Sequence, residues 1–160
     1  MPVEPDDFWQ FSVDIYARAG VADACLRLQD RDGLDLNLVL FCLWCGATGR
    51  ALETQALQAA VAACRPWREQ VLLPVRAIRR RLRGGIEHAP GTDAFRAEVK
   101  ALELQAERMQ QDLLRQLAPA AMQAPSVALA TQNFDAYARV AARKLAAPAD
   151  WQVILSAALP

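Results

Sequence analysis

Apolar residues occupy nearly every face of the segment 34–47, and the run from Leu38 to Cys45 has no polar break. Eleven of its fourteen residues are apolar. A helix without a polar face must be surrounded by other elements. The pattern therefore predicts a buried central helix over about residues 35–46, with Asp35 as its N-cap and Gly46 or Gly49 at its end.

Two shorter helices are predicted before this segment. Asp6 or Asp7 can cap the first, in which Phe8, Phe11 and Ile15 share one face. The apolar positions of the second are Val21, Ala24, Cys25 and Leu28. Both helices have one apolar side, so they are expected to pack against the central helix.

After the central helix, the chain reads as an Ala-rich helix over 50–64 and then an Arg-rich helix. Pro66 can begin the Arg-rich helix at its first turn, and Pro74 should kink or restart it. Val75, Ile78 and Leu82 form its expected inward face, and the glycine pair 84–85 ends it.

The next helix has apolar residues at alternating spacings of four and three. They are Phe95, Val99, Leu102, Ala106, Met109 and Leu113. Such a heptad seam predicts packing against another helix. With only a short loop before it, the favoured partner is the Arg-rich helix, giving a helical hairpin over about 65–117. A homodimer through the 95–113 seam is the alternative.

No convincing stretch alternates with period two, so the chain is predicted to be an all-α, single-domain helical bundle. We expect the bundle to cover residues 5–118. Residues 119–160 are rich in Ala and divided by prolines, and this helical tail is expected to pack less firmly.

The chain has 160 residues and no net charge, with 18 basic and 18 acidic side chains, so bulk charge gives no argument for nucleic acid or a membrane. The first residues are acidic and lack the apolar core of a secretory signal. The central segment is too short to span a bilayer. A cytoplasmic protein with reduced cysteines is therefore expected.

The four cysteines are Cys25, Cys42, Cys45 and Cys64. Cys42 and Cys45 have the C-x-x-C spacing of thiol oxidoreductases and of half a zinc site. They lie toward the C-terminal end of their helix, where the dipole disfavours a thiolate. The favoured interpretation is core packing; a thiolate metal site with the other cysteines or His88 stays an alternative.

The Arg-rich segment from Arg65 to Arg83 holds seven Arg and one Glu. Helical spacing places Arg76, Arg80 and Arg83 together on the expected solvent side, where an anionic partner would dock. Nucleic acid is disfavoured because no aromatic residues are interleaved and no nucleic-acid motif is present. A solvated face, or pairing with the acidic N-terminal helices, is the favoured interpretation.

A polar pocket among the first three helices is a second hypothesis. Its candidate residues are Trp9, Tyr16, Gln29, Asp35 and Asn37. The chain carries no nucleophile elbow, phosphate-binding loop, dinucleotide fingerprint or zinc-protease motif. No catalytic residue, metal ligand or cofactor is therefore assigned, and the sequence leans away from an enzyme.

The stretch from Phe8 to Gly46 resembles an uncharacterised family of small bacterial, chiefly proteobacterial, proteins known only as a domain of unknown function. The resembling elements are FWxFS, YxxxGV, ACLxLQ and GxDxNxxLFCxW. The resemblance is weaker from there to about residue 117 and does not reach the tail. It implies a helical cytosolic protein and no particular reaction.

The leading hypothesis is a non-enzymatic interaction or adaptor protein of the bacterial cytosol that uses charged helical faces to bind a protein partner. A small-molecule-binding protein or enzyme with the polar pocket is the alternative, and a thiolate metal site is the second alternative.

Overall fold

The computed structural model describes residues 7–145 and 147–159, and these residues form helices joined by short connections. The helices are α1 (Phe8–Tyr16), α2 (Val21–Asp30), α3 (Leu36–Ala47), α4 (Thr54–Trp67), the π-helical turn η1 (Arg68–Leu72), α5 (Leu73–Arg81), α6 (Thr92–Gln116), α7 (Val127–Val140) and α8 (Pro148–Ala158). Within that part of the chain, the only β-type pairing is an isolated bridge between Ile86 and Ala89. The predicted all-α class is confirmed.

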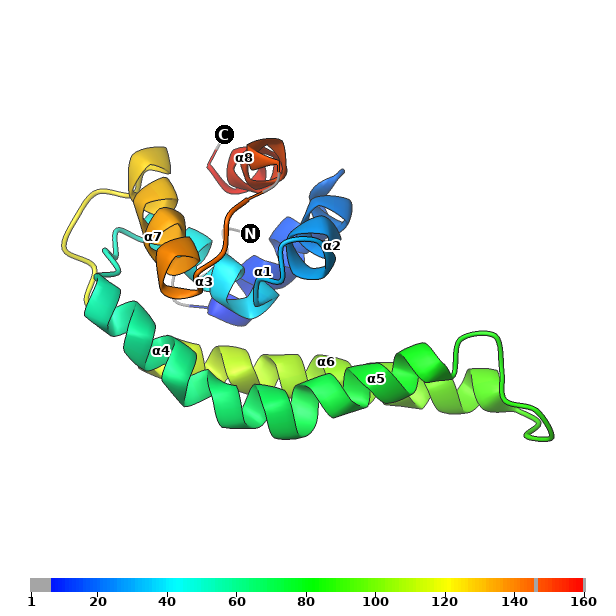
Figure 1. The fold of residues 1–160 in the computed structure, drawn as a ribbon. Coiled ribbons are helices and arrows are strands. Elements are labelled where there is room, and N and C mark those ends of the chain that lie inside the picture. The colour runs from blue at the N-terminus through cyan, green and yellow to red at the C-terminus, as the bar shows by residue number, and fades with distance from the viewer. Residues whose placement is uncertain (1–6, 146, 160) are drawn as a thin grey trace.

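The helices form a compact body and a long hairpin (Figure 1). Helices α1, α2, α3, α7 and α8 make the body. Helices α4, η1 and α5 form one rod that runs antiparallel to α6 along one side of the body. The outer end of this hairpin projects beyond the body, and we call residues 73–109 the arm.

Helix α3 is the centre of the body, as its sequence predicts. Every residue from Asn37 to Gly46 is buried. On one side the Phe8 ring of α1 stacks on Trp44, with ring centroids 5.2 Å apart. The N-cap predictions also hold, since Asp7 accepts a hydrogen bond from the backbone N–H of Gln10, and Asp35 accepts one from that of Asn37. Asp6, the other candidate cap, lies outside the described residues.

The tail packs more firmly than expected, because α7 covers a face of α3. Leu129, Ala130, Phe134 and Tyr137 are buried against the core, and Phe134 stacks on Trp151 of α8 at 4.1 Å. The Ala-rich composition, which suggested weak packing, allows the two helix backbones to approach closely. A Cβ atom on Gly46 would lie only 2.3 Å from the Ala130 Cα.

Asp150 links α8 to α2 and to Arg31, the residue that follows α2. It accepts hydrogen bonds of 2.8 Å from both Arg27 and Arg31. Burial of Asp150 disfavours its charge, but these two hydrogen bonds outweigh that effect, and its pKa lies below the usual range. Together with the α7 contacts, this clamp makes the tail part of the body.

The hairpin begins earlier than predicted, because Pro66 does not start a helix but lies inside α4. Because proline has no backbone N–H, Pro66 leaves the carbonyl of Ala62 without its helical hydrogen bond. Ala62 is exposed, so water can donate a hydrogen bond to this carbonyl instead. The rod then passes through η1 directly before Pro74. The buried Leu72 lies eight positions after the buried Cys64, whereas a regular helix returns to the same face after about seven positions. The wider π turn absorbs the extra residue.

The heptad seam on α6 is only half correct. Val99 and Ala106 are buried, but Phe95, Leu102 and Met109 are 55%, 52% and 55% exposed. The residues that α6 buries beside Val99 and Ala106 are Glu103, Gln110, Gln111 and Leu114. The helix is rotated relative to the prediction because polar groups, not only apolar ones, anchor it.

Replacing Gly46 by Ala should destabilise the fold. The added Cβ collides with the α7 backbone, and we expect this overpacking to outweigh the gain in helix propensity and to lower the free energy of unfolding by about 2 kcal/mol or more. Urea unfolding followed by circular dichroism measures the change. The exposed Ala62→Leu substitution is the control, expected to stay within about 0.5 kcal/mol. Equal stability of the two variants would contradict close α3–α7 packing.

Candidate functional site

A buried polar network lies where α3 meets the hairpin and α7. Its members are Asp35, Asn37, Arg68, Gln110, Gln111 and Tyr137. They come from the start of α3, from η1, from α6 and from α7. Asp35 and Asn37 are thus fixed by partners that are distant in sequence.

Asp35 is the centre of this network. One carboxylate oxygen caps α3 through the Asn37 N–H at 3.0 Å and lies 3.4 Å from the Arg68 guanidinium. The other accepts a 2.7 Å hydrogen bond from Gln110 Nε2. The Asp35 backbone N–H donates to the Tyr137 hydroxyl at 2.8 Å. Burial, and next the negative charge of Asp35, raise the pKa of Tyr137, so its hydroxyl stays protonated.

Asn37 joins α3 to α6 through both atoms of its side-chain amide. Its Nδ2 donates to Gln110 Oε1 at 3.1 Å, and its Oδ1 accepts from Gln111 Nε2 at 3.0 Å. A buried amide costs free energy unless its hydrogen bonds are made, so the register of α6 on α3 is specified at this point.

The five candidate pocket residues do not meet in one cavity. Asp35 and Asn37 belong to the network, Tyr16 is exposed, and Trp9 lies under the Arg108 guanidinium at 5.6 Å. Gln29 makes a long hydrogen bond to its neighbour Asp30. Two shallow surface hollows, one beside Ala51 and Pro119 and one beside Arg18 and Ser156, contain none of the five.

A second cluster of charges joins the two helices of the arm. Arg76 donates to Glu103 at 2.9 Å and to Glu107 at 3.2 Å, and Arg79 also donates to Glu103. Burial disfavours the Glu103 charge, but the hydrogen bonds from Arg79 and Arg76 outweigh it, so the pKa of Glu103 lies below its usual range. Glu107 has weaker pairing, and burial raises its pKa.

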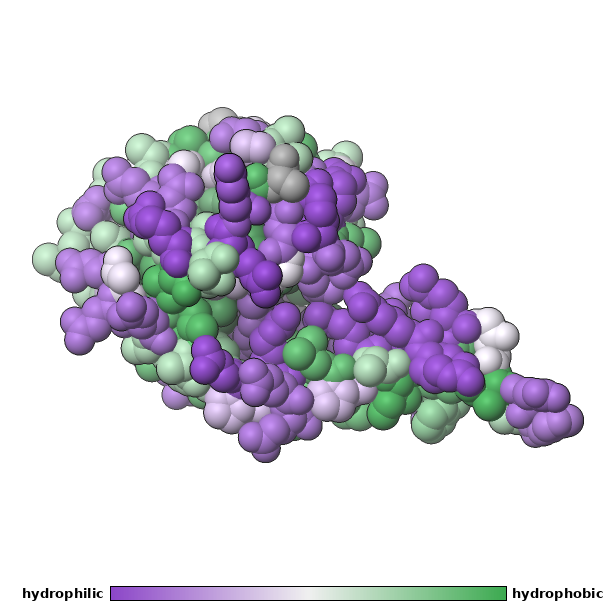
Figure 2. Space-filling model, viewed as in Figure 1, coloured by the Kyte–Doolittle hydropathy of each residue, from purple (hydrophilic) through white to green (hydrophobic). Residues whose placement is uncertain are grey.

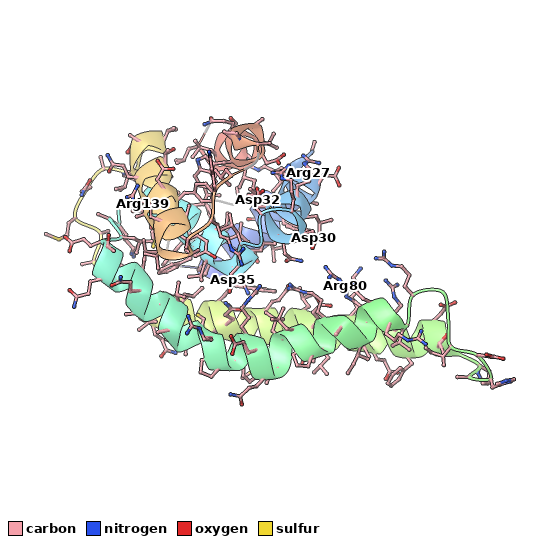
Figure 3. The ribbon with its side chains drawn as sticks, in the orientation of Figure 1. Arg27, Asp30, Asp32, Asp35, Arg80 and Arg139 are labelled. Atoms are coloured by element: carbon pink, nitrogen blue, oxygen red, sulfur yellow. The ribbon has the colours of Figure 1, made fainter. Side chains whose placement is uncertain are left out.

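The three arginines expected on one solvent face have separate roles. Arg76 is only 8% exposed and pairs inside the hairpin, which corrects the predicted orientation. Arg80 lies on the side of the arm facing α2 and pairs with Asp30 at 3.1 Å (Figure 3). Arg83 is exposed near the end of α5. The sequence missed Glu103 and Glu107 as partners because they fall between the positions of the assumed apolar seam.

An apolar stripe runs along the arm on the side away from the body. It consists of Ile78, Phe95, Leu102 and Met109, with the half-buried Val75 between the two helices. Ile78, predicted to point inward, is 49% exposed. Figure 2 shows hydrophobic residues along this lower edge of the arm, below the hydrophilic side that faces the body. The charged pairs thus lie in the interface of the hairpin and on its edge toward the body, and the stripe lies on the opposite edge.

The four cysteines are buried and free. Burial raises the pKa of the Cys25 and Cys64 thiols to about 12 and also raises those of Cys42 and Cys45. Such thiols are poor nucleophiles at neutral pH, as the core-packing interpretation predicts. In residues 7–145 and 147–159, no three His, Cys, Asp or Glu side chains are grouped so that they would hold a metal ion. The same residues contain no helix of the length and apolarity needed to cross a membrane.

A family model matches residues 7–114, which is more than half of the 160-residue chain. Its description is "Protein of unknown function (DUF2390)". The chain belongs to the DUF2390 family. No curated protein and no solved structure matches it. The DUF2390 match includes α1 to α5 and most of α6, with Gln110, Gln111 and the whole stripe, and it ends before α7.

Replacing Gln110 by Met should test the network at nearly constant side-chain size. The change removes the partners of Asp35 and Asn37 in a buried site, and we expect the free energy of unfolding to fall by about 2–4 kcal/mol. Urea unfolding measures it. Gln105→Met, at an exposed position of the same helix, is the control and should stay within about 0.5 kcal/mol. A similar small effect at Gln110 would argue against the network as an anchor.

The arm should lose stability in acid through Glu103. A carboxyl whose pKa is lowered by folding contributes stability above its unfolded pKa, about 4.3, and loses it as the pH falls through the lower folded value. Glu103→Gln should therefore lower the free energy of unfolding by about 2 kcal/mol at pH 7 and by progressively less below about pH 4.

Glu107→Gln, on the same helix, should change the free energy of unfolding with pH in the opposite direction. Because folding raises the pKa of Glu107, its charge opposes folding at neutral pH, and this effect disappears in acid. Urea unfolding between about pH 3 and pH 7 compares both variants with the wild type. Parallel pH profiles for the two variants would show that the assigned directions are wrong.

Proposed function

We propose that the protein is a non-enzymatic interaction protein of the bacterial cytosol, and that its arm binds a protein partner. The observation that supports this function is the apolar stripe. Four large apolar side chains lie together on a projecting hairpin, each about half exposed. Contiguous apolar surface of this kind marks interaction sites, whereas single exposed apolar residues are ordinary.

The arrangement of the charges supports the apolar edge over the charged edge as the docking surface. Arg76 and Arg79 are already paired with Glu103, and Arg80 is paired with Asp30. A ligand for these arginines would have to replace internal partners. The apolar side chains of the stripe are about half exposed, and burying them releases water from their surface, which favours association.

Site-specific photo-crosslinking in living cells tests this function. A benzophenone amino acid at Leu102 or at Ile78 should give a higher-mass protein adduct, because these side chains lie in the proposed contact. The same probe at Gln58, an exposed position on α4 outside the stripe, should give none. Adding Phe95→Glu to the Ile78 probe chain should abolish the adduct. No adduct from either stripe position, or equal adducts from Gln58, would contradict the proposal.

A further inference from the structure

Among the described residues, the arm consists of two helices with no second layer over the face that carries the stripe. Helices bury their apolar surface by packing against another layer. On α6 the exposed members of the stripe recur every seven residues at Phe95, Leu102 and Met109, the spacing of a helix–helix seam. A pair of helices is thus the type of surface that fits the stripe.

The register of the hairpin shows which residues lie at equal height along the arm. Arg76 bonds to Glu103, and α5 and α6 run antiparallel. Counting two residues on from Arg76 and one back from Glu103 brings Ile78 nearly level with Leu102. Counting five residues from each brings Arg81 level with Glu98.

Opposite charges border the stripe on its two helices. Glu98 lies three residues after Phe95 and four before Leu102, so it sits at the α6 margin, and Asp112 follows Met109 by three. Arg81 follows Ile78 by three and sits at the α5 margin. Glu98, Arg81 and Asp112 are exposed, and none of them makes an ion pair within residues 7–145 and 147–159.

We propose that the partner of the stripe is the arm of a second copy of this chain, related by a two-fold axis parallel to the arm. This inference rests on the proposed function of the stripe as a docking surface. The rotation places α6 of one protomer over α5 of the other in antiparallel orientation. Leu102 then meets Ile78 of the second protomer, and Glu98 lies beside its Arg81, so apolar positions face apolar positions and opposite charges face each other.

The perpendicular two-fold axis is less favourable. It would place α6 on α6, bringing the margins that carry Glu98 and Asp112 together, and α5 on α5, bringing together the Arg margins. Like charges in such positions destabilise an interface. The body does not obstruct the favoured arrangement, since it lies on the opposite edge of each hairpin (Figures 1 and 2).

The size of the stripe predicts a weak dimer. At 1.5 Å per residue the distance from Phe95 to Met109 is about 21 Å, and two adjacent helices are about 20 Å wide. Each protomer then contributes roughly 400 Å² in projection, and the total lies below the ~1,200 Å² of stable complexes. We expect a dissociation constant in the micromolar range.

Sedimentation velocity of the full chain between about 1 and 200 μM tests the dimer. The wild type should shift from monomer to dimer across this range. Leu102→Glu should raise the dissociation constant at least about tenfold, and Gln58→Glu, on exposed α4 surface, should leave it unchanged. Circular dichroism should show unchanged helix content, because both side chains are exposed.

A charge exchange tests the arrangement of the two arms. Glu98→Arg should weaken the dimer about three- to tenfold, as should Arg81→Glu, and the double variant should recover most of the wild-type affinity. Recovery supports α6 over α5. A double variant weaker than both single variants overturns that arrangement.

Two results would overturn the homodimer itself. One is a monomer at every concentration, and the other is a dimer that Leu102→Glu does not weaken. If the chain is monomeric while the Leu102 probe still crosslinks to a different protein in cells, the self-association proposal fails and the proposed function of the stripe stands. If neither occurs, both fail.

Discussion

The structure depends on the need to surround α3, a helix with no polar side, while leaving its polar entrance satisfied. The apolar part is covered by α1, α7 and Leu114 of α6, with Phe8 and Trp44 stacked on one side. At the entrance, Asp35 and Asn37 would be costly to bury alone. That cost is offset by hydrogen bonds with Gln110, Gln111 and Tyr137 and by an ion pair with Arg68. Because these partners come from three other elements, this one requirement also sets how the hairpin and α7 sit on the body.

The features that depended on local pattern could be predicted from the sequence. The caps at Asp7 and Asp35, the stripe of α2 and the burial of the α3 cysteines all follow from residue type and spacing, and all are confirmed. A helix that is apolar on every side can be placed only in the interior, so its position in the fold follows from its sequence.

The errors arose where a polar residue is buried by a distant partner. The α6 prediction assumed that the inward face is the apolar one, which selects Phe95, Leu102 and Met109. In the structure Glu103 and Gln110 point inward instead, because Glu103 accepts a hydrogen bond from Arg76 and Gln110 donates one to Asp35. Sequence spacing alone cannot show such pairs, as each partner read singly looks like a surface residue. The same reasoning explains Arg76, which helical spacing alone puts on the solvent side and which the structure buries against Glu103.

The rotation of α6 has a direct consequence for the arm. Two antiparallel helices have one shared interface and two edges, and polar pairing fills the interface and the edge toward the body. Phe95, Leu102 and Met109 are thereby displaced to the other edge, where no helix among the described residues covers them. A sequence that needed only a stable hairpin would place apolar residues in the interface and polar ones outside. On α6 this arm instead buries Glu103 and leaves Phe95, Leu102 and Met109 exposed, which costs stability in the isolated chain. The cost is offset if another layer of helices covers the exposed edge, so the distribution itself favours association through the arm.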